Sequence, residues 1–92
     1  MSVLVYTESD NGKFKKNAFE AASYANAVAQ QMGTTVTAVS INAENNEELG
    51  NYGVSKVLAV SDDKLNSFSA KAYANTITEA VAKENATIVI VS

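Results

Sequence analysis

The sequence lacks several residue types, and each absence excludes a kind of chemistry. It contains no cysteine, histidine, tryptophan, proline or arginine in its 92 residues. Without cysteine there is no disulfide framework, thiolate metal site or thiol nucleophile. Without histidine the commonest general base and metal ligand is missing. Without arginine no planar guanidinium can hold a phosphate through two parallel hydrogen bonds.

Charge and hydrophobicity exclude two further classes of protein. The net charge of −3 argues against nucleic acid as a partner. No apolar run approaches the roughly 20 residues that span a bilayer, so we expect no membrane insertion. Apolar residues make up 47% of the chain, which is typical of one small globular domain covering residues 1–92. Because the absence of cysteine fits a reducing compartment, we expect a cytoplasmic location.

Four stretches have the composition of β-strands. Residues Val3–Tyr6 are apolar without alternation, which is typical of a parallel strand covered on both faces. Residues Thr35–Ile41 are rich in β-branched side chains, as are Thr87–Val91, and a further strand is predicted at Lys56–Val60.

Two long helices are expected between these strands. The first runs from Lys15 or Lys16 to Met32, because its apolar residues recur in steps of three and four, and Gly33 then ends it in a left-handed conformation. The second follows a cap at Ser69, runs to about Glu84 and ends at Asn85 in the same way. Its expected buried residues are Ala70, Tyr73, Ala74, Ile77, Ala80 and Val81.

A third, short helix is expected in "NAENNEELGNYG", capped by Asn45 or Asn46 and closed by Gly50 and Gly53. The predicted order is therefore βαβαβαβ, which indicates a parallel sheet with right-handed crossovers. In such sheets ligands bind beyond the carboxyl ends of the strands, so the loops there are the places to look for a site.

The loop after the first strand is "ESDNGK", with a turn signal at Asn11-Gly12. One glycine beside two carboxylates makes a poor phosphate cradle, and a solvated turn is the simpler interpretation. Glu8 and Asp10 could join Asp62-Asp63 in an acidic Mg²⁺ pocket, although the aspartate pair also suits an ordinary turn before a helix.

Two further features have both a functional and a structural interpretation. The lysines at 13, 15 and 16 could face an anionic partner, or could simply be solvated. Tyr52 could cap a pocket, or could pack on the sheet edge. No histidine or Gly-x-Ser-x-Gly elbow activates any serine. We therefore predict no enzyme, and no catalytic, cofactor-binding or metal-binding residue in this chain.

Several segments match a known family in order and spacing. "VLVYTESDNGKFKKNAFEAASYANAVAQQMG", "ELGNYGVSKVLAVSDDKL" and "AKAYANTITEAV" resemble the N-terminal part of the alpha subunit of electron-transfer flavoprotein. The resemblance covers Ser2 to Ser92. It implies a three-layer, doubly wound α/β fold of the adenine-nucleotide hydrolase-like, Rossmann-like type, with strand order 3-2-1-4.

The resemblance also implies a function. Such a subunit pairs with a beta subunit, and the heterodimer relays electrons from acyl-CoA or other dehydrogenases through FAD. The flavin lies in a later domain and AMP lies in the beta subunit, so no residue of either site is carried over to this chain. We expect the chain to be an N-terminal scaffold and interface domain, truncated after its fourth strand.

A second class of function stays open at this point. Small stand-alone nucleotide-binding modules of the universal-stress type share the broad fold. Their glycine-rich phosphate motif follows the fourth strand, so its absence before Ser92 does not exclude them. The acidic loop after the first strand argues against them, although Asp10 could serve as a ligand there.

Overall fold

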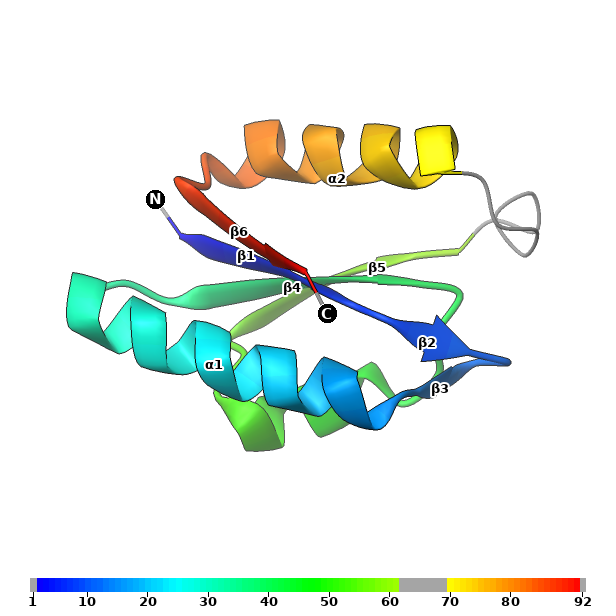
Figure 1. The fold of residues 1–92 in the computed structure, drawn as a ribbon, viewed down its shortest axis with the longest axis horizontal. Helices are drawn as coiled ribbons and strands as arrows, with labels where there is room; N and C mark the ends of the chain where they lie inside the picture. The colour runs from blue at the N-terminus through cyan, green and yellow to red at the C-terminus, as the bar shows by residue number, and fades with distance from the viewer. Residues whose placement is uncertain (1, 62–69, 92) are drawn as a thin grey trace.

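The computed structural model describes residues 2–61 and 70–91 (Figure 1). Its two long helices are α1 (Lys16–Met32) and α2 (Ala70–Glu84), and a 3₁₀ helix is η1 (Asn46–Tyr52). The strands are β1 (Val3–Thr7), β2 (Ser9–Asp10), β3 (Lys13–Phe14), β4 (Val36–Ile41), β5 (Lys56–Val60) and β6 (Ile88–Val91). No helix within the described residues is long and apolar enough to cross a membrane.

The main sheet has four parallel strands in the order β5-β4-β1-β6. The central strand β1 places Val3 opposite Val36 of β4 on one side and opposite Ile88 of β6 on the other. Numbered along the chain, the four strands follow the order 3-2-1-4. The predicted doubly wound, Rossmann-like topology is therefore confirmed.

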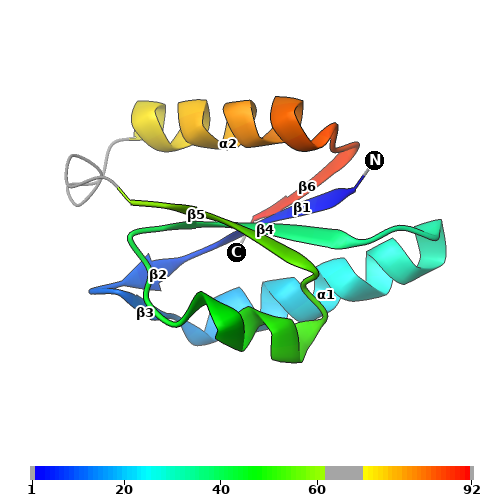
Figure 2. The same ribbon diagram turned by 180° about the vertical axis from the view of Figure 1, so that it is seen from behind.

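Helices cover both faces of this sheet, which makes three layers (Figures 1 and 2). Helices α1 and η1 lie against one face and α2 lies across the other. Because successive strand residues point to opposite faces, Val3 and Val5 join the core beneath α1, whereas Leu4 joins Val39 and Ala80 beneath α2. This two-sided burial explains why the first strand has no polar alternation.

Helix α1 packs on the sheet through a stripe of alanines. Ala18, Ala22, Ala25 and Ala29 are all fully or almost fully buried. Such small side chains let the helix backbone approach the strands closely. Gly33 ends the helix at φ 72°, as predicted, and its N–H and that of Thr34 donate to the carbonyl oxygens of Gln30 and Ala29.

The short helix differs from the prediction in type and in cap. Asn45 occupies its N-cap in a left-handed conformation and makes no side-chain capping bond. The Asn46 side chain instead accepts a hydrogen bond from Ser40 Oγ and donates to the Ala43 carbonyl oxygen at 3.1 Å. The predicted N-cap position at Asn45 is therefore confirmed, but the side-chain capping bond expected there does not form. Gly53 closes the helix at φ 93°, as expected.

Helix α2 follows the predicted range, while Ser69 lies outside the described residues. Ala80 is buried, and Ile77 and Val81 are partly buried against Leu4 and Val39. Ala74 is exposed, so its predicted place on the buried face is wrong. One helix resting on a wider sheet buries only a narrow stripe. Asn85 adopts φ 51°, which confirms its left-handed position after the helix.

Candidate functional site

The segment after β1 forms a two-stranded antiparallel hairpin rather than a loop. Strand β2 pairs with β3, with Ser9 opposite Phe14 and Asp10 opposite Lys13. Its turn residues, Asn11 and Gly12, have φ angles of 52° and 82°. Two successive positive φ angles are the mark of a tight hairpin turn, and Asn-Gly is its strongest sequence signal. From Asn11-Gly12 we predicted a turn, but we did not predict the two short strands that flank it.

This hairpin is fastened to the end of β4. Ser9 Oγ donates to the Ile41 carbonyl oxygen at 3.0 Å, and the Glu44 N–H donates to the Gly12 carbonyl oxygen at 2.7 Å. The carboxyl ends of β1 and β4 are therefore held together at one edge. A polar hollow of about 300 Å³ opens there, lined by Ser9, Asp10, Asn11, Gly12, Ile41, Asn42 and Tyr73.

A pair of tyrosines connects this edge to helix α2. The rings of Tyr6 and Tyr73 meet edge to face, with centroids 6.1 Å apart. Burial raises the pKa of Tyr6 to about 12, and the neighbouring Tyr73 and Glu8 add to the rise. Tyr6 therefore stays neutral at physiological pH and contributes packing rather than acid–base chemistry.

The described residues give no support to an acidic metal pocket. Glu8 Oε2 lies 3.5 Å from Lys15 Nζ in an ion pair, and Asp10 is exposed in the hairpin. Asp62 and Asp63, the other expected ligands, lie outside the described residues. Among the residues that are described, no three acidic side chains lie close enough to hold a metal ion.

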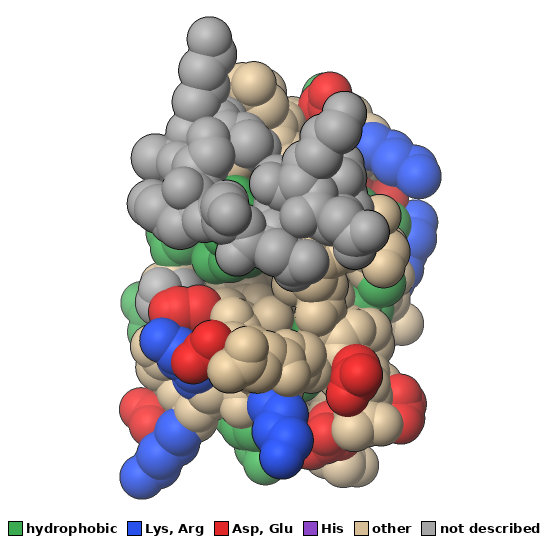
Figure 3. Space-filling view, turned by 90° about the vertical axis from the view of Figure 1, so that its right-hand side faces the viewer, with side chains coloured by type: hydrophobic (Ala, Val, Ile, Leu, Met, Phe, Trp, Pro, Cys, Tyr) green, Lys and Arg blue, Asp and Glu red, His purple; other side chains and the backbone are tan. Residues whose placement is uncertain are grey.

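The lysines near the start of α1 do not form a surface of one sign. Lys15 pairs with Glu8, and Lys13 and Lys16 are exposed. Figure 3 looks onto the right-hand end of the view in Figure 1, where basic and acidic side chains are interspersed below the grey residues. Whether these lysines meet an anionic partner stays a prediction.

We expected Tyr52 to pack on the sheet edge, and the structure places its ring against helix α1. Its ring stacks on Phe19 with centroids 4.7 Å apart and planes 26° apart, and Phe14 meets Phe19 edge to face. Tyr52 remains 37% exposed and lines a shallow hollow of about 430 Å³ with Lys16, Phe19, Glu20 and Ser23. If Tyr52 caps a pocket, that pocket is this hollow at the surface.

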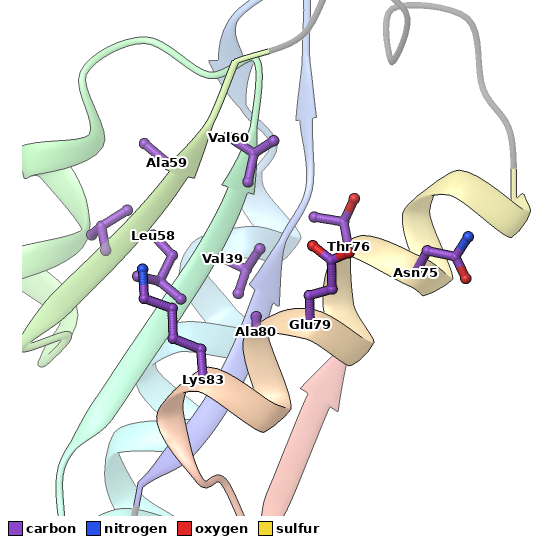
Figure 4. A pocket seen from close by; sticks show the side chains of 10 residues that line it. Val39, Leu58, Ala59, Val60, Asn75, Thr76, Glu79, Ala80 and Lys83 are labelled. Atoms are coloured by element: carbon purple, nitrogen blue, oxygen red, sulfur yellow. The ribbon is translucent and has the colours of Figure 1, made fainter.

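A further hollow is a groove of about 680 Å³ beside α2 (Figure 4). Its sheet side is apolar and includes Val39 and Leu58, while Glu79, Ala80 and Lys83 come from helix α2. Sequence reasoning missed this groove because its existence depends on where α2 crosses the sheet. It offers apolar surface for packing, and among the described residues that line it the charged ones, Glu79 and Lys83, belong to α2.

The described residues do not fit a flavin. FAD needs a pocket that buries a large ring system and a group that grips its pyrophosphate. The hollow at the carboxyl edge is small and polar, and the Asp10 carboxylate in it would repel a phosphate. The groove beside α2 has an apolar floor but no glycine-rich loop or helix N-terminus directed into it.

Comparison with known proteins identifies the family of this chain. The model of the electron transfer flavoprotein domain matches residues 3–92. The chain belongs to the electron transfer flavoprotein domain family. A relative from Anaerotignum propionicum, the acryloyl-CoA reductase electron transfer subunit beta, is 26% identical over 92 residues, which is 97% of this chain. The chain spans about a quarter of that relative's length.

This membership agrees with the chemistry of the described residues. The family is named after electron transfer flavoprotein, and the relative's name describes an electron transfer subunit. The part of the chain that the structure describes has hollows at its carboxyl edge, beside α2 and beside Tyr52.

Proposed function

We propose that this chain is the N-terminal domain of an electron-transfer flavoprotein alpha subunit, acting as a scaffold and as an interface to the beta subunit. The observation that carries the proposal is the family match, which runs along nearly the whole chain from residue 3 to residue 92. The resemblance of "VLVYTESDNGKFKKNAFEAASYANAVAQQMG" to the opening of that subunit supports the alpha assignment.

In this proposal the chemistry lies elsewhere in the assembly. FAD accepts electrons from acyl-CoA or other dehydrogenases, in a domain that these 92 residues do not include. AMP binds in the beta subunit. The relative from Anaerotignum propionicum carries the name of an electron transfer subunit, although its name says beta. The name of this relative therefore supports a role in electron transfer. The assignment as an alpha subunit rests on the sequence resemblance alone.

The described surface supports an interface role in physical terms. Tyr24, Met32 and Tyr52 are exposed on the side of α1 and η1, and Val91 is exposed on β6. Tyrosine and methionine are enriched at the centres of protein interfaces. Large apolar side chains on several faces suit a domain that packs against other parts of a complex.

Thermal unfolding with added nucleotides tests this proposal against a nucleotide-binding module. A scaffold domain should show no change in melting temperature when ATP, AMP or FAD is added. A stand-alone module of the universal-stress type should be stabilised by ATP at micromolar concentrations, because a ligand that binds only the folded state raises the melting temperature. Stabilisation by ATP that is lost in Asp10→Ala would contradict the scaffold proposal and place the nucleotide at the carboxyl edge.

A further inference from the structure

The tip of the β2–β3 hairpin carries the one Asn-Gly pair in the sequence, Asn11-Gly12. Figure 1 shows this hairpin at one end of the molecule. Asn11 is exposed, and so are its neighbours Asp10 and Lys13. The backbone nitrogen of the following residue can attack an asparagine amide, and glycine there favours the attack because it has no Cβ atom to obstruct the approach. The hairpin tip therefore places an accessible amide next to the residue most able to react with it.

We propose that Asn11 deamidates spontaneously through a cyclic succinimide formed with Gly12. The Gly12 nitrogen bonds to Cγ of Asn11, and the amide nitrogen leaves as ammonia, together with the hydrogen that the Gly12 nitrogen loses. Water then opens the five-membered ring at one of its two carbonyl carbons. Opening at Cγ yields an ordinary aspartate. Opening at the backbone carbonyl carbon yields isoaspartate, in which the chain continues through the former side chain.

The other asparagines of the described residues are less suited to this reaction. Each of them is followed by a residue larger than glycine. Asn26 and Asn75 also lie within α-helices, where intrahelical hydrogen bonds hold the next N–H group. The Asn46 side chain is engaged by Ser40 and by the Ala43 carbonyl oxygen. We therefore expect Asn11 to react first.

The folded hairpin restrains this reaction. Closing the ring requires the Asn11 backbone to rotate out of the tight turn, so the hairpin must open first. Its ladder has only two residue pairs, but two hydrogen bonds fasten it to the chain at and after the end of β4. Ser9 Oγ donates to the Ile41 carbonyl oxygen, and the Glu44 N–H donates to the Gly12 carbonyl oxygen. The rate of deamidation therefore depends on how often these anchors release.

Deamidation changes the carboxyl edge of the sheet. Either product places a second carboxylate beside Asp10 in the lining of the polar hollow. Isoaspartate also adds a methylene group to the backbone of the turn. Because turn length sets the register of a hairpin, the pairing of Asp10 with Lys13 and the bond from Glu44 to Gly12 cannot then both be kept.

Peptide mass spectrometry of the folded 92-residue chain, sampled during incubation in mildly alkaline buffer, tests this proposal. Cleavage after lysine releases residues 1–13, in which Asn11 is the one asparagine, and residues 72–83, in which Asn75 is the one asparagine. We expect Asn11 to deamidate about tenfold faster than Asn75 or more, because Thr76 is β-branched and its N–H lies within a helix. Isoaspartate should exceed aspartate among the products.

A pair of serine variants tests the role of the anchor. Ser9→Ala removes the bond to Ile41 and should speed deamidation of Asn11 by about two- to tenfold, as the loss of one hydrogen bond allows. The matched control is Ser55→Ala, which changes an exposed serine outside the hairpin and should leave the rate unchanged. Circular dichroism verifies that both variants stay folded. The wild type unfolded in urea should react faster than folded Ser9→Ala, because the turn is then lost.

Three outcomes would overturn the proposal. A rate at Asn11 no higher than that at Asn75 excludes the site. Aspartate formed without isoaspartate excludes the succinimide. Equal rates in the wild type and in Ser9→Ala exclude control by the hairpin anchor. None of these outcomes depends on the assignment to an electron-transfer flavoprotein subunit.

Discussion

Gly33 and Gly53 both adopt left-handed backbone conformations, but their surroundings differ. A Cβ atom added at Gly33, with φ 72°, would meet nothing within 4 Å. At Gly53, with φ 93°, it would lie 2.3 Å from Cγ of Asn26. We expect Gly33→Ala to cost about 1–2 kcal/mol from backbone strain alone. Gly53→Ala should cost at least about 1 kcal/mol more, because Asn26 must also move.

Urea unfolding of the two alanine variants measures this difference. Equal destabilisation would mean that the Asn26 side chain can move away from residue 53 without a measurable loss of stability.

Ionisation of Tyr6 should lower the stability of the domain at alkaline pH. Its pKa is about 12 in the folded state against 10.0 for an ordinary tyrosine. As pH rises through 10, the unfolded chain loses this proton before the folded chain does, so the free energy of unfolding falls until about pH 12. In Tyr6→Phe this contribution is absent.

We therefore expect the free energy of unfolding of Tyr6→Phe to decline less steeply than that of the wild type between pH 10 and pH 12. Urea melts at intervals across this range provide the comparison. Identical slopes for the two proteins would show that Tyr6 ionises as easily in the folded state as in the unfolded state.

Among the elements, helix α1 depends most on small side chains. Ala22 is fully buried between the helix and the sheet, whereas Ala27 is exposed on the same helix. Ala22→Leu forces extra volume into a close contact and should destabilise the domain by about 1–3 kcal/mol. Ala27→Leu keeps the same helix propensity change without the steric conflict and should stay within about 0.5 kcal/mol of wild type.

Thermal and urea unfolding of this pair separate packing from propensity. If Ala22→Leu were as stable as Ala27→Leu, the alanine stripe would not be in close contact with the strands.

The main elements could be predicted from the sequence because local signals and burial agree. Uninterrupted apolar runs such as Val3–Tyr6 require a strand covered on both faces, and Gly33 and Asn85 have the left-handed conformations that their chemistry favours. The 3₁₀ form of η1 could not be predicted, because Asn46 makes its bonds to Ser40 and Ala43 only in the folded chain. The groove beside α2 likewise depends on where the helix crosses the sheet.

The candidate site was the least predictable part of the molecule. The Asn11-Gly12 signal identified a turn, but the anchoring of its hairpin by Ser9 to Ile41 joins residues 32 positions apart. Tyr52 gave no sequence signal for stacking on Phe19, since that contact requires η1 to fold back on α1.

At the scale of the whole molecule, the chain is proposed to support a flavoprotein without holding the flavin. We expect the purified chain to be colourless, because its described hollows offer no grip for a pyrophosphate. Visible absorption spectroscopy tests this, with protein concentration determined independently. A yellow preparation with flavin bound in near-stoichiometric amount would contradict the absence of a flavin site.

The central claim is that this chain is an interface domain of a two-subunit electron carrier. The most direct measurement is native mass spectrometry of the tagged chain, co-expressed with an electron-transfer flavoprotein beta subunit and, separately, with an unrelated protein of the same fold class. We expect a one-to-one complex with the beta subunit and no complex with the unrelated protein. Failure to form that complex, together with stabilisation of the isolated chain by ATP, would contradict the claim.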